Sequence, residues 1–287
     1  MGAAGDSVSS RDRRDTITRL LLDRESVTVQ ELAGRFNVSS MTVHRDLDAL
    51  EEIGVLRKVR GGATAQPTSV YESSLGFRMG QMQAAKVEIA RLAAERVAPG
   101  ESVALDDSTT TLALIPFLAE IPQLTIVTHF VAVVEEVARL KEGELHLIVV
   151  GGTYDYKYHA FVGAIAQQQL LDLSVDHSFI SVSSVDVERG AFHQEPDHAA
   201  LKRTLTRIGR DSSLLVDSSK FRGTGLHRVL GLAEFDAIYV DDTVTSSALE
   251  SMRDQGLTVH VARSSHPGAA AESGADPMAT APNGRLK

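Results

Sequence analysis

The stretch VTVQELAGRFNVSSMTVHRD, residues 27–46, decides the fold of the N-terminal part of the chain. Thr28 and Glu31 have the spacing of a capping box, in which a hydroxyl and a carboxylate satisfy free amides at a helix start. A second helix start follows at Ser39. Two starts this close leave room for a short first helix and a tight connection through Asn37. The spacing therefore predicts a helix-turn-helix unit.

The second of these helices has an apolar and a polar side. Val43, Leu47 and Leu50 recur at helical spacing and are expected to face a small core. Asp46 points toward the edge of that core and is expected to be structural. A helix in the DNA major groove reads bases with its N-terminal turns, and arginine can pair with a guanine edge, while hydroxyls and amides at a helix start suit a phosphate. The candidates for DNA contacts on this helix are Ser39, Ser40, Met41, Thr42, His44 and Arg45.

Basic residues follow the second helix. Val55-Leu56 and Lys58-Val59 are predicted to form a short hairpin. Cations on such a hairpin contact backbone phosphates and give affinity without sequence choice. A helix-turn-helix used only for protein contacts is the alternative, and the basic hairpin favours DNA binding. The cations concerned are Arg57, Lys58 and Arg60.

A helix is also predicted over residues 11–23, ahead of the helix-turn-helix, with Ile17, Leu20 and Leu21 on its buried side. Three arginines near its start either contact phosphate or belong to a solvated charged face. They are Arg11, Arg13 and Arg14.

The segment SSMTVHRDLDALEEIGVLRKVRGGA, residues 39–63, resembles the DNA-binding head of DeoR-type bacterial transcription regulators. Their usual pattern is close to S-x-x-T-I-R-R-D-L followed by G-x-L-x-R-x-x-G-G-A. The resemblance covers residues 13–63 and departs from the pattern at His44, where the family generally has arginine. It implies a winged helix-turn-helix that binds a double-stranded DNA operator, with repression as the commoner behaviour.

Composition sets the limits for the rest of the chain. With 287 residues, 43% hydrophobic and 23% charged, the chain is long enough for two globular domains. The absence of cysteine excludes disulfides and thiolate chemistry. No apolar run approaches the roughly 20 residues that span a bilayer, so we expect a cytoplasmic protein without membrane contact.

The net charge of −9 is unevenly distributed. Residues 1–65 hold 10 basic and 10 acidic side chains, and the remainder holds 19 basic and 28 acidic ones. An acidic body is repelled by DNA. DNA contact is therefore expected only at the basic rim of the head.

From residue 83 onward, short apolar runs alternate with helical patterns. This alternation predicts an α/β domain with a largely parallel sheet covered on both faces. The expected organisation is a DNA-binding domain over 11–64, a linker over 65–82, an effector-binding and oligomerisation domain over 83–263 and a disordered tail over 264–287. The expected strands are 102–105, 124–128, 144–150, 177–182, 213–217, 237–241 and 258–262.

Polar residues follow several of these strands, where ligands bind in parallel sheets. Asp106 to Thr111 lie between a strand and a helix, and such a helix start can hold a phosphate. Thr128, the pair Gly151-Gly152 and the segment from Asp217 to Lys220 follow other strands. Polar groups at several strand ends together favour a small anionic ligand.

Residues 86–261 resemble the effector domain of the DeoR-type regulators, in LDDSTTT, IVTHF, VVGGTY and LVDSSKF and in a helix that carries Lys202. That domain is similar in fold to ribose-5-phosphate isomerase and glucosamine-6-phosphate deaminase, and its usual effectors are phosphorylated sugars or related metabolites. Ser108 stands where the family has glycine, and Ser181 and Ser183 stand in another stretch usually rich in glycine. By this resemblance the effector-binding candidates are Asp106, Ser108, Thr109, Thr110, Thr128, Gly151, Gly152, Lys202, Asp217 and Lys220.

Two other functions use the same residues. A sugar-phosphate isomerase or deaminase needs a general base, for which Asp107 and His129 are available. A protein-interaction module would instead show no salt-sensitive binding to duplex DNA. Metal binding has little support, since Pro196 interrupts the cluster HQEPDH, and we expect neither a metal nor a cofactor. Paired heads match palindromic half-sites, so a homodimer or homotetramer is expected.

Overall fold

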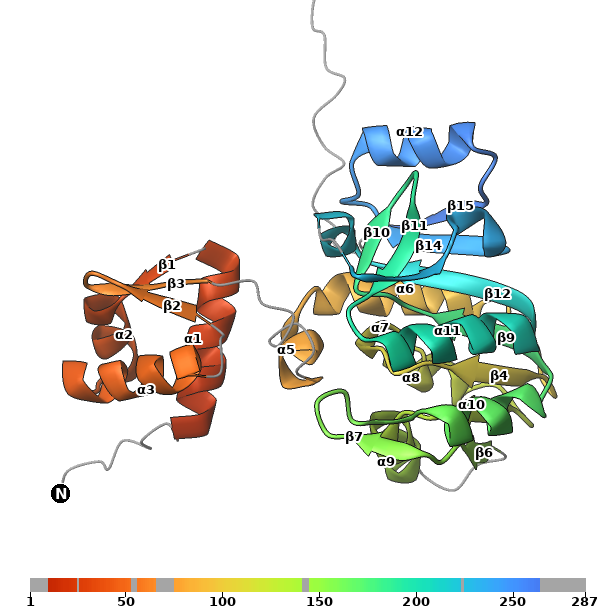
Figure 1. Ribbon diagram of the computed structural model, residues 1–287, viewed down its shortest axis with the longest axis horizontal. Coiled ribbons are helices and arrows are strands. Elements are labelled where there is room, and N and C mark those ends of the chain that lie inside the picture. The colour runs from red at the N-terminus through yellow and green to blue at the C-terminus, as the bar shows by residue number, and fades with distance from the viewer. Residues whose placement is uncertain are drawn as a thin grey trace, which may run out of the picture.

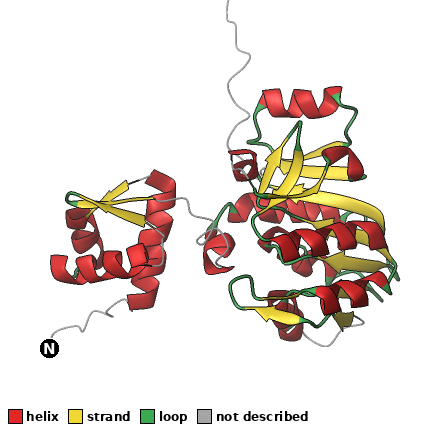
Figure 2. Cartoon of the chain, viewed as in Figure 1, coloured by secondary structure: helices red, strands yellow, loops and turns green. Residues whose placement is uncertain are grey.

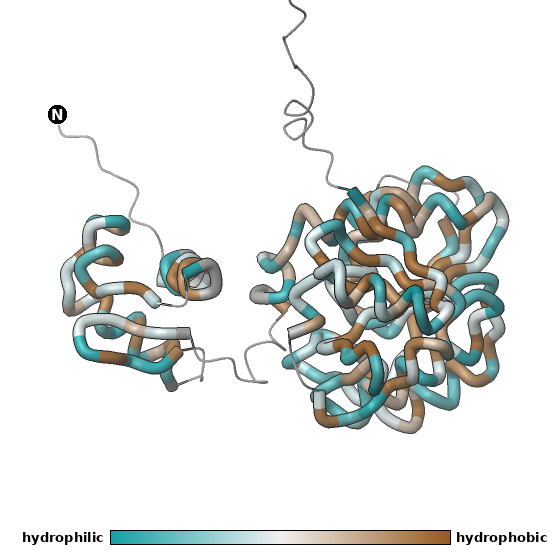
Figure 3. Tube along the Cα trace, turned by 90° about the horizontal axis from the view of Figure 1, so that it is seen from above, coloured by the Kyte–Doolittle hydropathy of each residue, from teal (hydrophilic) through white to brown (hydrophobic). Residues whose placement is uncertain are grey.

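The computed structural model describes residues 10–24, 26–52, 56–65, 75–140, 145–222 and 225–263. These residues form a small N-terminal unit, the head, and a larger α/β unit, the body (Figure 1). Each unit has its own buried apolar core. Figure 3 shows apolar residues recurring along the chain in both units. The predicted tail, 264–287, lies outside the described residues, and no helix within the described ranges is long and apolar enough to cross a membrane.

The head is a winged helix-turn-helix, as predicted. Thr28 Oγ1 accepts a hydrogen bond from the amide of Glu31 at 3.1 Å, and Asn37 ends the first helix of the motif in a left-handed conformation with φ 52°. The Glu31 carboxylate does not complete the capping box, because it accepts a hydrogen bond from Arg24 at 2.8 Å instead. The elements of the head are α1 (Ser10–Arg24), β1 (Ser26–Thr28), α2 (Val29–Phe36), α3 (Ser40–Glu52), β2 (Leu56–Val59) and β3 (Gly62–Ala65), with the strands in the order β1-β3-β2.

The core of the head joins α1 to α3. Val43 and Leu47 are fully buried, as their spacing predicts. Arg13 and Asp46 form a buried ion pair, with Nε and Oδ2 2.5 Å apart. The prediction for Asp46 is thus confirmed, whereas the phosphate contact considered for Arg13 is wrong, because its side chain is buried against α3. Arg14 donates to the carbonyl of Ser10, and the Arg11 side chain lies outside the described residues.

The hairpin after α3 turns later than predicted. β2 is one continuous strand over 56–59, and the chain reverses at Arg60 and Gly61 before β3. Gly61 adopts φ 82°, and a Cβ on Gly62 would lie 2.1 Å from the carbonyl oxygen of Val27 in β1. The two glycines therefore determine where the turn lies. We call β2, this turn and β3 the wing; Val55 lies outside the described residues.

The body contains a seven-stranded sheet in which every strand pairing is parallel, as predicted. The strands lie in the order β15-β14-β12-β9-β4-β5-β6, so that β4, β9 and β12 are central and β6 and β15 form the edges. Their bounds are β4 (Ser102–Leu105), β5 (Thr125–Thr128), β6 (His146–Val149), β9 (Val175–Ile180), β12 (Gly209–Val216), β14 (Ala237–Asp241) and β15 (Val259–Ala262).

Helices cover both faces of this sheet (Figure 2). Successive residues of β4 point to opposite faces, with Ala104 in one apolar cluster and Val103 and Leu105 in the other. One face packs against α10 (Ala164–Leu171), α11 (Pro196–Ile208) and α12 (Ser246–Asp254), and the other packs against α6 (Gln83–Ala94), α7 (Thr109–Leu112), α8 (Ile115–Leu118) and α9 (Val131–Arg139).

Several elements of the body were not predicted. Two antiparallel additions flank the main sheet, because their three- and four-residue strands are too short to give a periodic pattern. Helix α5 (Leu75–Gly80) lies inside the range predicted as linker. The first addition is the hairpin of β7 (Thr153–Asp155) and β8 (Ala160–Val162), and the second is the sheet of β10 (Ser184–Asp186), β11 (Gly190–His193) and β13 (His227–Leu230). The short 3-10 helices η1 (Ser218–Arg222) and η2 (Leu232–Glu234) were not predicted either.

Candidate functional site

The first half of α3 presents an exposed polar surface. Met41 is 65% exposed, and Ser39, Ser40, His44 and Arg45 are also exposed. Thr42 is only partly exposed, because its hydroxyl lies 3.0 Å from that of Ser39 at the helix cap. Of the six predicted residues, Ser39 directly precedes α3 and the other five lie in its first half, and all except Thr42 are exposed.

The wing contributes two exposed cations, Arg57 and Arg60. Lys58 differs from them, because its ammonium pairs with Asp48 on α3. The Lys58 amide also donates to the carboxylate of Glu51 at 2.7 Å. Lys58 therefore fastens the wing to α3.

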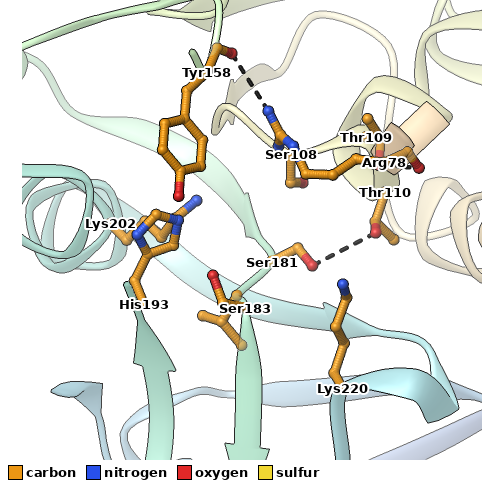
Figure 4. Close-up of a pocket in the computed structure, with 11 residues that line it drawn as sticks. Arg78, Ser108, Thr109, Thr110, Tyr158, Ser181, Ser183, His193, Lys202 and Lys220 are labelled. Carbon is orange, nitrogen blue, oxygen red and sulfur yellow. Dashed lines mark hydrogen bonds between the residues drawn. The ribbon is translucent and has the colours of Figure 1, made fainter. Parts of the chain in front are cut away.

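A second candidate site is a polar pocket of about 40 Å³ in the body (Figure 4). It lies where β4, β9 and β12 end, at the middle of the sheet. The N-terminus of α7 provides one wall, and side chains from α5, α11, η1 and the β7–β8 hairpin complete it. The residues that line the pocket are Arg78, Ser108, Thr109, Thr110, Tyr158, Ser181, Val182, Ser183, His193, Lys202 and Lys220.

Asp106 shapes the wall formed by α7. Its Oδ1 accepts hydrogen bonds from the Ser108 amide at 3.1 Å and from the Thr111 hydroxyl at 2.8 Å. Its Oδ2 accepts from the Ser181 amide at 2.8 Å, which connects the ends of β4 and β9. Ser108 in turn caps α7 by accepting from the Thr111 amide at 3.0 Å. Asp106 therefore fixes the conformation of the turn and does not itself line the pocket.

Lys202 lines the pocket from a buried position and is held between two carboxylates. Its Nζ lies 2.6 Å from Asp106 Oδ2 and 2.7 Å from Asp107 Oδ1. Burial lowers the pKa of Lys202, but the two carboxylates outweigh it and leave that pKa raised. Burial likewise raises the pKa of Asp107, and Lys202 and His198 outweigh it and hold that pKa well below its ordinary value. The charge of Lys202 is thus already compensated within the protein.

His198 joins this cluster to the β7–β8 hairpin. Its Nδ1 lies 2.5 Å from Asp107 Oδ2 and its Nε2 lies 3.1 Å from Asp155 Oδ2. Burial lowers the pKa of His198, and the Asp107 and Asp155 carboxylates outweigh it, so the pKa is raised. His193 stacks on His198 with ring centroids 5.2 Å apart, and burial holds its pKa well below the ordinary value. Burial thus disfavours protonation of the imidazole on the pocket surface, while two carboxylates favour protonation of the one behind it.

The remaining cations of the pocket are Arg78 and Lys220. Arg78 donates to the carbonyl of Asp107 at 2.8 Å and to that of Tyr158 at 3.4 Å, and its guanidinium lies 5.2 Å from the centre of the Tyr158 ring. Its Nε is buried and has no hydrogen-bond partner within the described ranges. No carboxylate among the described residues forms an ion pair with Arg78 or Lys220. These two cations are thus available to an anion.

The structure brings only part of the predicted effector site together. Ser108, Thr109, Thr110, Lys202 and Lys220 line the pocket, and so do Ser181 and Ser183, whose side chains replace the expected glycines. Sequence reasoning missed Arg78 and Tyr158, because the one lies in the predicted linker and the other in an unpredicted hairpin.

Four predicted residues lie elsewhere and have structural contacts. The Thr128 hydroxyl donates to the Leu105 carbonyl at 3.0 Å, and Asp217 Oδ1 accepts from the Ser219 amide at 3.0 Å. Gly151 and Gly152 follow the edge strand β6, away from the central strands. A Cβ on Gly152 would lie 2.7 Å from a backbone oxygen of β8, so this glycine permits close packing.

Across the ranges that the structure describes, no group of three or more histidine, aspartate and glutamate side chains could hold a metal ion. The buried carboxylates are occupied by Lys202 and His198 instead.

Two family models match the chain. The DeoR C terminal sensor domain matches residues 81–242, and the DeoR-like helix-turn-helix domain matches residues 13–68. The chain belongs to the DeoR family of transcription regulators. The exposed surface of α3 and the wing is therefore part of a DNA-binding domain, and the pocket is part of a sensor domain.

Relatives of this DeoR-family regulator are themselves transcription regulators and not enzymes, so the isomerase alternative is wrong. An uncharacterised helix-turn-helix-type regulator, YgbI of Escherichia coli, is 32% identical over 88% of this chain and 98% of its own length. A putative aga operon repressor of Escherichia coli O157:H7 is 30% identical over 86% of this chain and 92% of its own length. The repressor AccR of Agrobacterium fabrum is 30% identical over 86% of this chain and 95% of its own length.

Among solved structures, ribose 5-phosphate isomerase A of Methanocaldococcus jannaschii is similar over 47% of this chain and 53% of that protein, with 18% identity and a TM-score of 0.34. The chain thus spans about half of that isomerase. A score this low supports no conclusion about activity.

Proposed function

We propose that this regulator binds an operator through α3 and the wing and represses genes of carbohydrate metabolism, and that a phosphorylated sugar or related metabolite in the pocket modulates this binding. The regulator acts in the cytoplasm as a homodimer or homotetramer, since two heads match the half-sites of a palindrome. The DNA-binding domain extends over 11–64 and the effector domain over 83–263.

The observation that carries the proposal is the charge balance of the pocket. Lys202 is neutralised by Asp106 and Asp107, whereas Arg78 and Lys220 have no carboxylate partner in the described ranges. The hydroxyls of Ser108, Thr109 and Thr110 lie beside these two cations. Hydrogen bonds between cationic donors and phosphate oxygens are among the stronger ones in proteins. A phosphorylated ligand supplies the missing negative charge.

The relatives support a link to carbohydrate metabolism. Among them are the putative aga operon repressor and an L-fucose operon activator of Haemophilus influenzae. Repressors and activators thus both occur among similar proteins, and we propose that this chain is a repressor.

The experiment uses a duplex selected from genomic fragments by the wild-type protein. Binding is measured by fluorescence anisotropy with sugar phosphates and with the same sugars lacking phosphate. We expect only phosphorylated compounds to change the affinity, and Lys220→Gln to require a higher concentration of them for the same response. Lys157→Gln is the matched control, since Lys157 is a partly exposed lysine that pairs with Glu195 and does not line the pocket. Equal responses to sugars with and without phosphate would refute the proposal.

A further inference from the structure

The inference concerns α5, the helix that precedes the effector domain. Its Arg78 side chain lines the pocket, and its ribbon lies between the head and the rest of the body (Figure 1). The guanidinium is joined to the body by the carbonyls of Asp107 and Tyr158. The carbonyl of Arg78 itself accepts from Lys86 Nζ at 2.5 Å, and Lys86 also donates to Thr109 at 3.0 Å. Arg78 is therefore held at both its side chain and its backbone by groups of the body.

The other side of α5 contacts the head. Helices α1 and α5 pack against each other, although the segment between the wing and α5 lies outside the described residues. Within the head, the buried pair of Arg13 and Asp46 joins α1 to α3. A continuous series of contacts thus leads from the pocket to the helix that presents the DNA-reading surface.

We propose that Arg78 couples the pocket to the head: an anion that binds its guanidinium changes the position of α5, and α5 passes the change through α1 to α3. This inference rests on the proposed anionic effector. Arg78 suits the role because its two donor contacts are to neutral carbonyls, one of them 3.4 Å long, and its Nε is unpartnered. A phosphate is a stronger acceptor than a carbonyl and competes for the same guanidinium. Ligand then binds the two positions of α5 unequally, which is the condition for coupling.

Lys220 provides a matched comparison. It is the other cation of the pocket without a carboxylate partner in the described ranges, but it lies on η1 and not on α5. Removing either charge is expected to weaken phosphate binding about tenfold, the effect of losing one hydrogen bond between charged groups. Only the loss of Arg78 should uncouple the head.

The test is hydrogen exchange on the full chain with inorganic phosphate as the probe and chloride at equal ionic strength as the reference. In the wild type, saturating phosphate is expected to protect residues 106–112 and to change exchange in α5 and α1. Arg78→Gln should keep the protection at 106–112 at saturation and lose the response in α1. Lys220→Gln should keep both at saturation.

A second variant guards against a folding defect. Arg78→Lys retains the charge but lacks the planar fork that reaches two carbonyls, so it should bind phosphate about as well as the wild type and respond less in α1. A persistent α1 response in Arg78→Gln, or its equal loss in Lys220→Gln, would overturn the coupling role of Arg78. Absence of protection at 106–112 in the wild type would instead refute the proposed anion site, and the coupling with it.

Discussion

Replacing Lys202 with methionine tests the charge balance beneath the pocket. The substitution keeps the length of the side chain and removes an ammonium that lies 2.6 Å and 2.7 Å from two fully buried carboxylates. Breaking a buried ion pair by removing one partner costs about 3–5 kcal/mol, because the other charge stays buried without compensation. For a domain of this size, each kcal/mol of lost unfolding free energy lowers the midpoint temperature of thermal unfolding by about 2–4 °C. We therefore expect Lys202→Met to lower the unfolding temperature of the effector domain by about 6–20 °C.

The pH dependence gives this prediction a second, independent readout. In the wild type the pKa of Asp107 is held below its ordinary value, so its contribution to stability is complete above the unfolded-state pKa of about 3.9 and is lost as the pH falls further. Without Lys202, His198 opposes the burial of Asp107 alone, so the folded-state pKa of Asp107 is higher than in the wild type. The stability deficit of the variant relative to the wild type therefore narrows as the pH falls.

Calorimetry at a series of pH values measures both effects. Lys157→Met is the control, because Lys157 and Glu195 form a partly exposed pair 2.9 Å apart, and such pairs contribute about 0–1 kcal/mol. The account of the buried cluster is wrong if Lys202→Met destabilises the effector domain no more than Lys157→Met does. It is also wrong if the stability deficit of Lys202→Met relative to the wild type widens as the pH falls.

Three further predictions concern DNA contacts, packing and a titrating lysine. Arg45→Ala should weaken binding to the selected operator by about 1–3 kcal/mol and relax base choice, whereas Arg57→Ala should weaken all duplexes alike and reduce the salt dependence, as titrations by anisotropy will measure. Gly152→Ala should destabilise the effector domain by about 1–3 kcal/mol in thermal unfolding and leave phosphate affinity unchanged, because the new methyl group meets backbone and not ligand. Burial lowers the pKa of Lys86 to about 7, so wild-type stability should rise between about pH 7 and 10, and Lys86→Met should flatten that rise in calorimetry.

Each of these predictions has an opposing result. Equal salt slopes and equal loss of base choice in the two arginine variants would remove the division between reading and anchoring. A weakened phosphate affinity in Gly152→Ala would return this glycine to the binding site. An unchanged pH profile in Lys86→Met would mean that Lys86 is not the titrating group.

The sequence predicted the elements whose patterns repeat over several turns or strands. The apolar spacing of Val43, Leu47 and Leu50 was sufficient for α3, and the alternation of apolar runs was sufficient for the parallel sheet. Ser108 to Thr110 were found because they follow a central strand. The same rule selected Gly151, which follows the edge strand β6 and does not line the pocket, because a sequence does not show whether a strand is central or at an edge.

Two features of the site depend on tertiary contacts that no local pattern contains. Arg78 contacts carbonyls 29 and 80 residues further along the chain. Lys202 was predicted to face the ligand, yet its partners 96 and 95 residues away compensate its charge. The sequence therefore predicted that Lys202 lies at the site, but it did not predict that neighbouring carboxylates already compensate the charge of this side chain.

The wall of the pocket opposite α7 is the short β7–β8 hairpin, whose Tyr158 faces the cavity. The hairpin pairs only with itself among the named strands of the described residues, but its Tyr158, Ala160 and Val162 are buried in the apolar clusters that cover the sheet. Exposed positions of the hairpin such as Tyr156 can therefore change without weakening the framework, whereas these three cannot. Exchange of this ten-residue loop between paralogues, with its buried positions kept, is accordingly a practical route to biosensors with new chemical preferences.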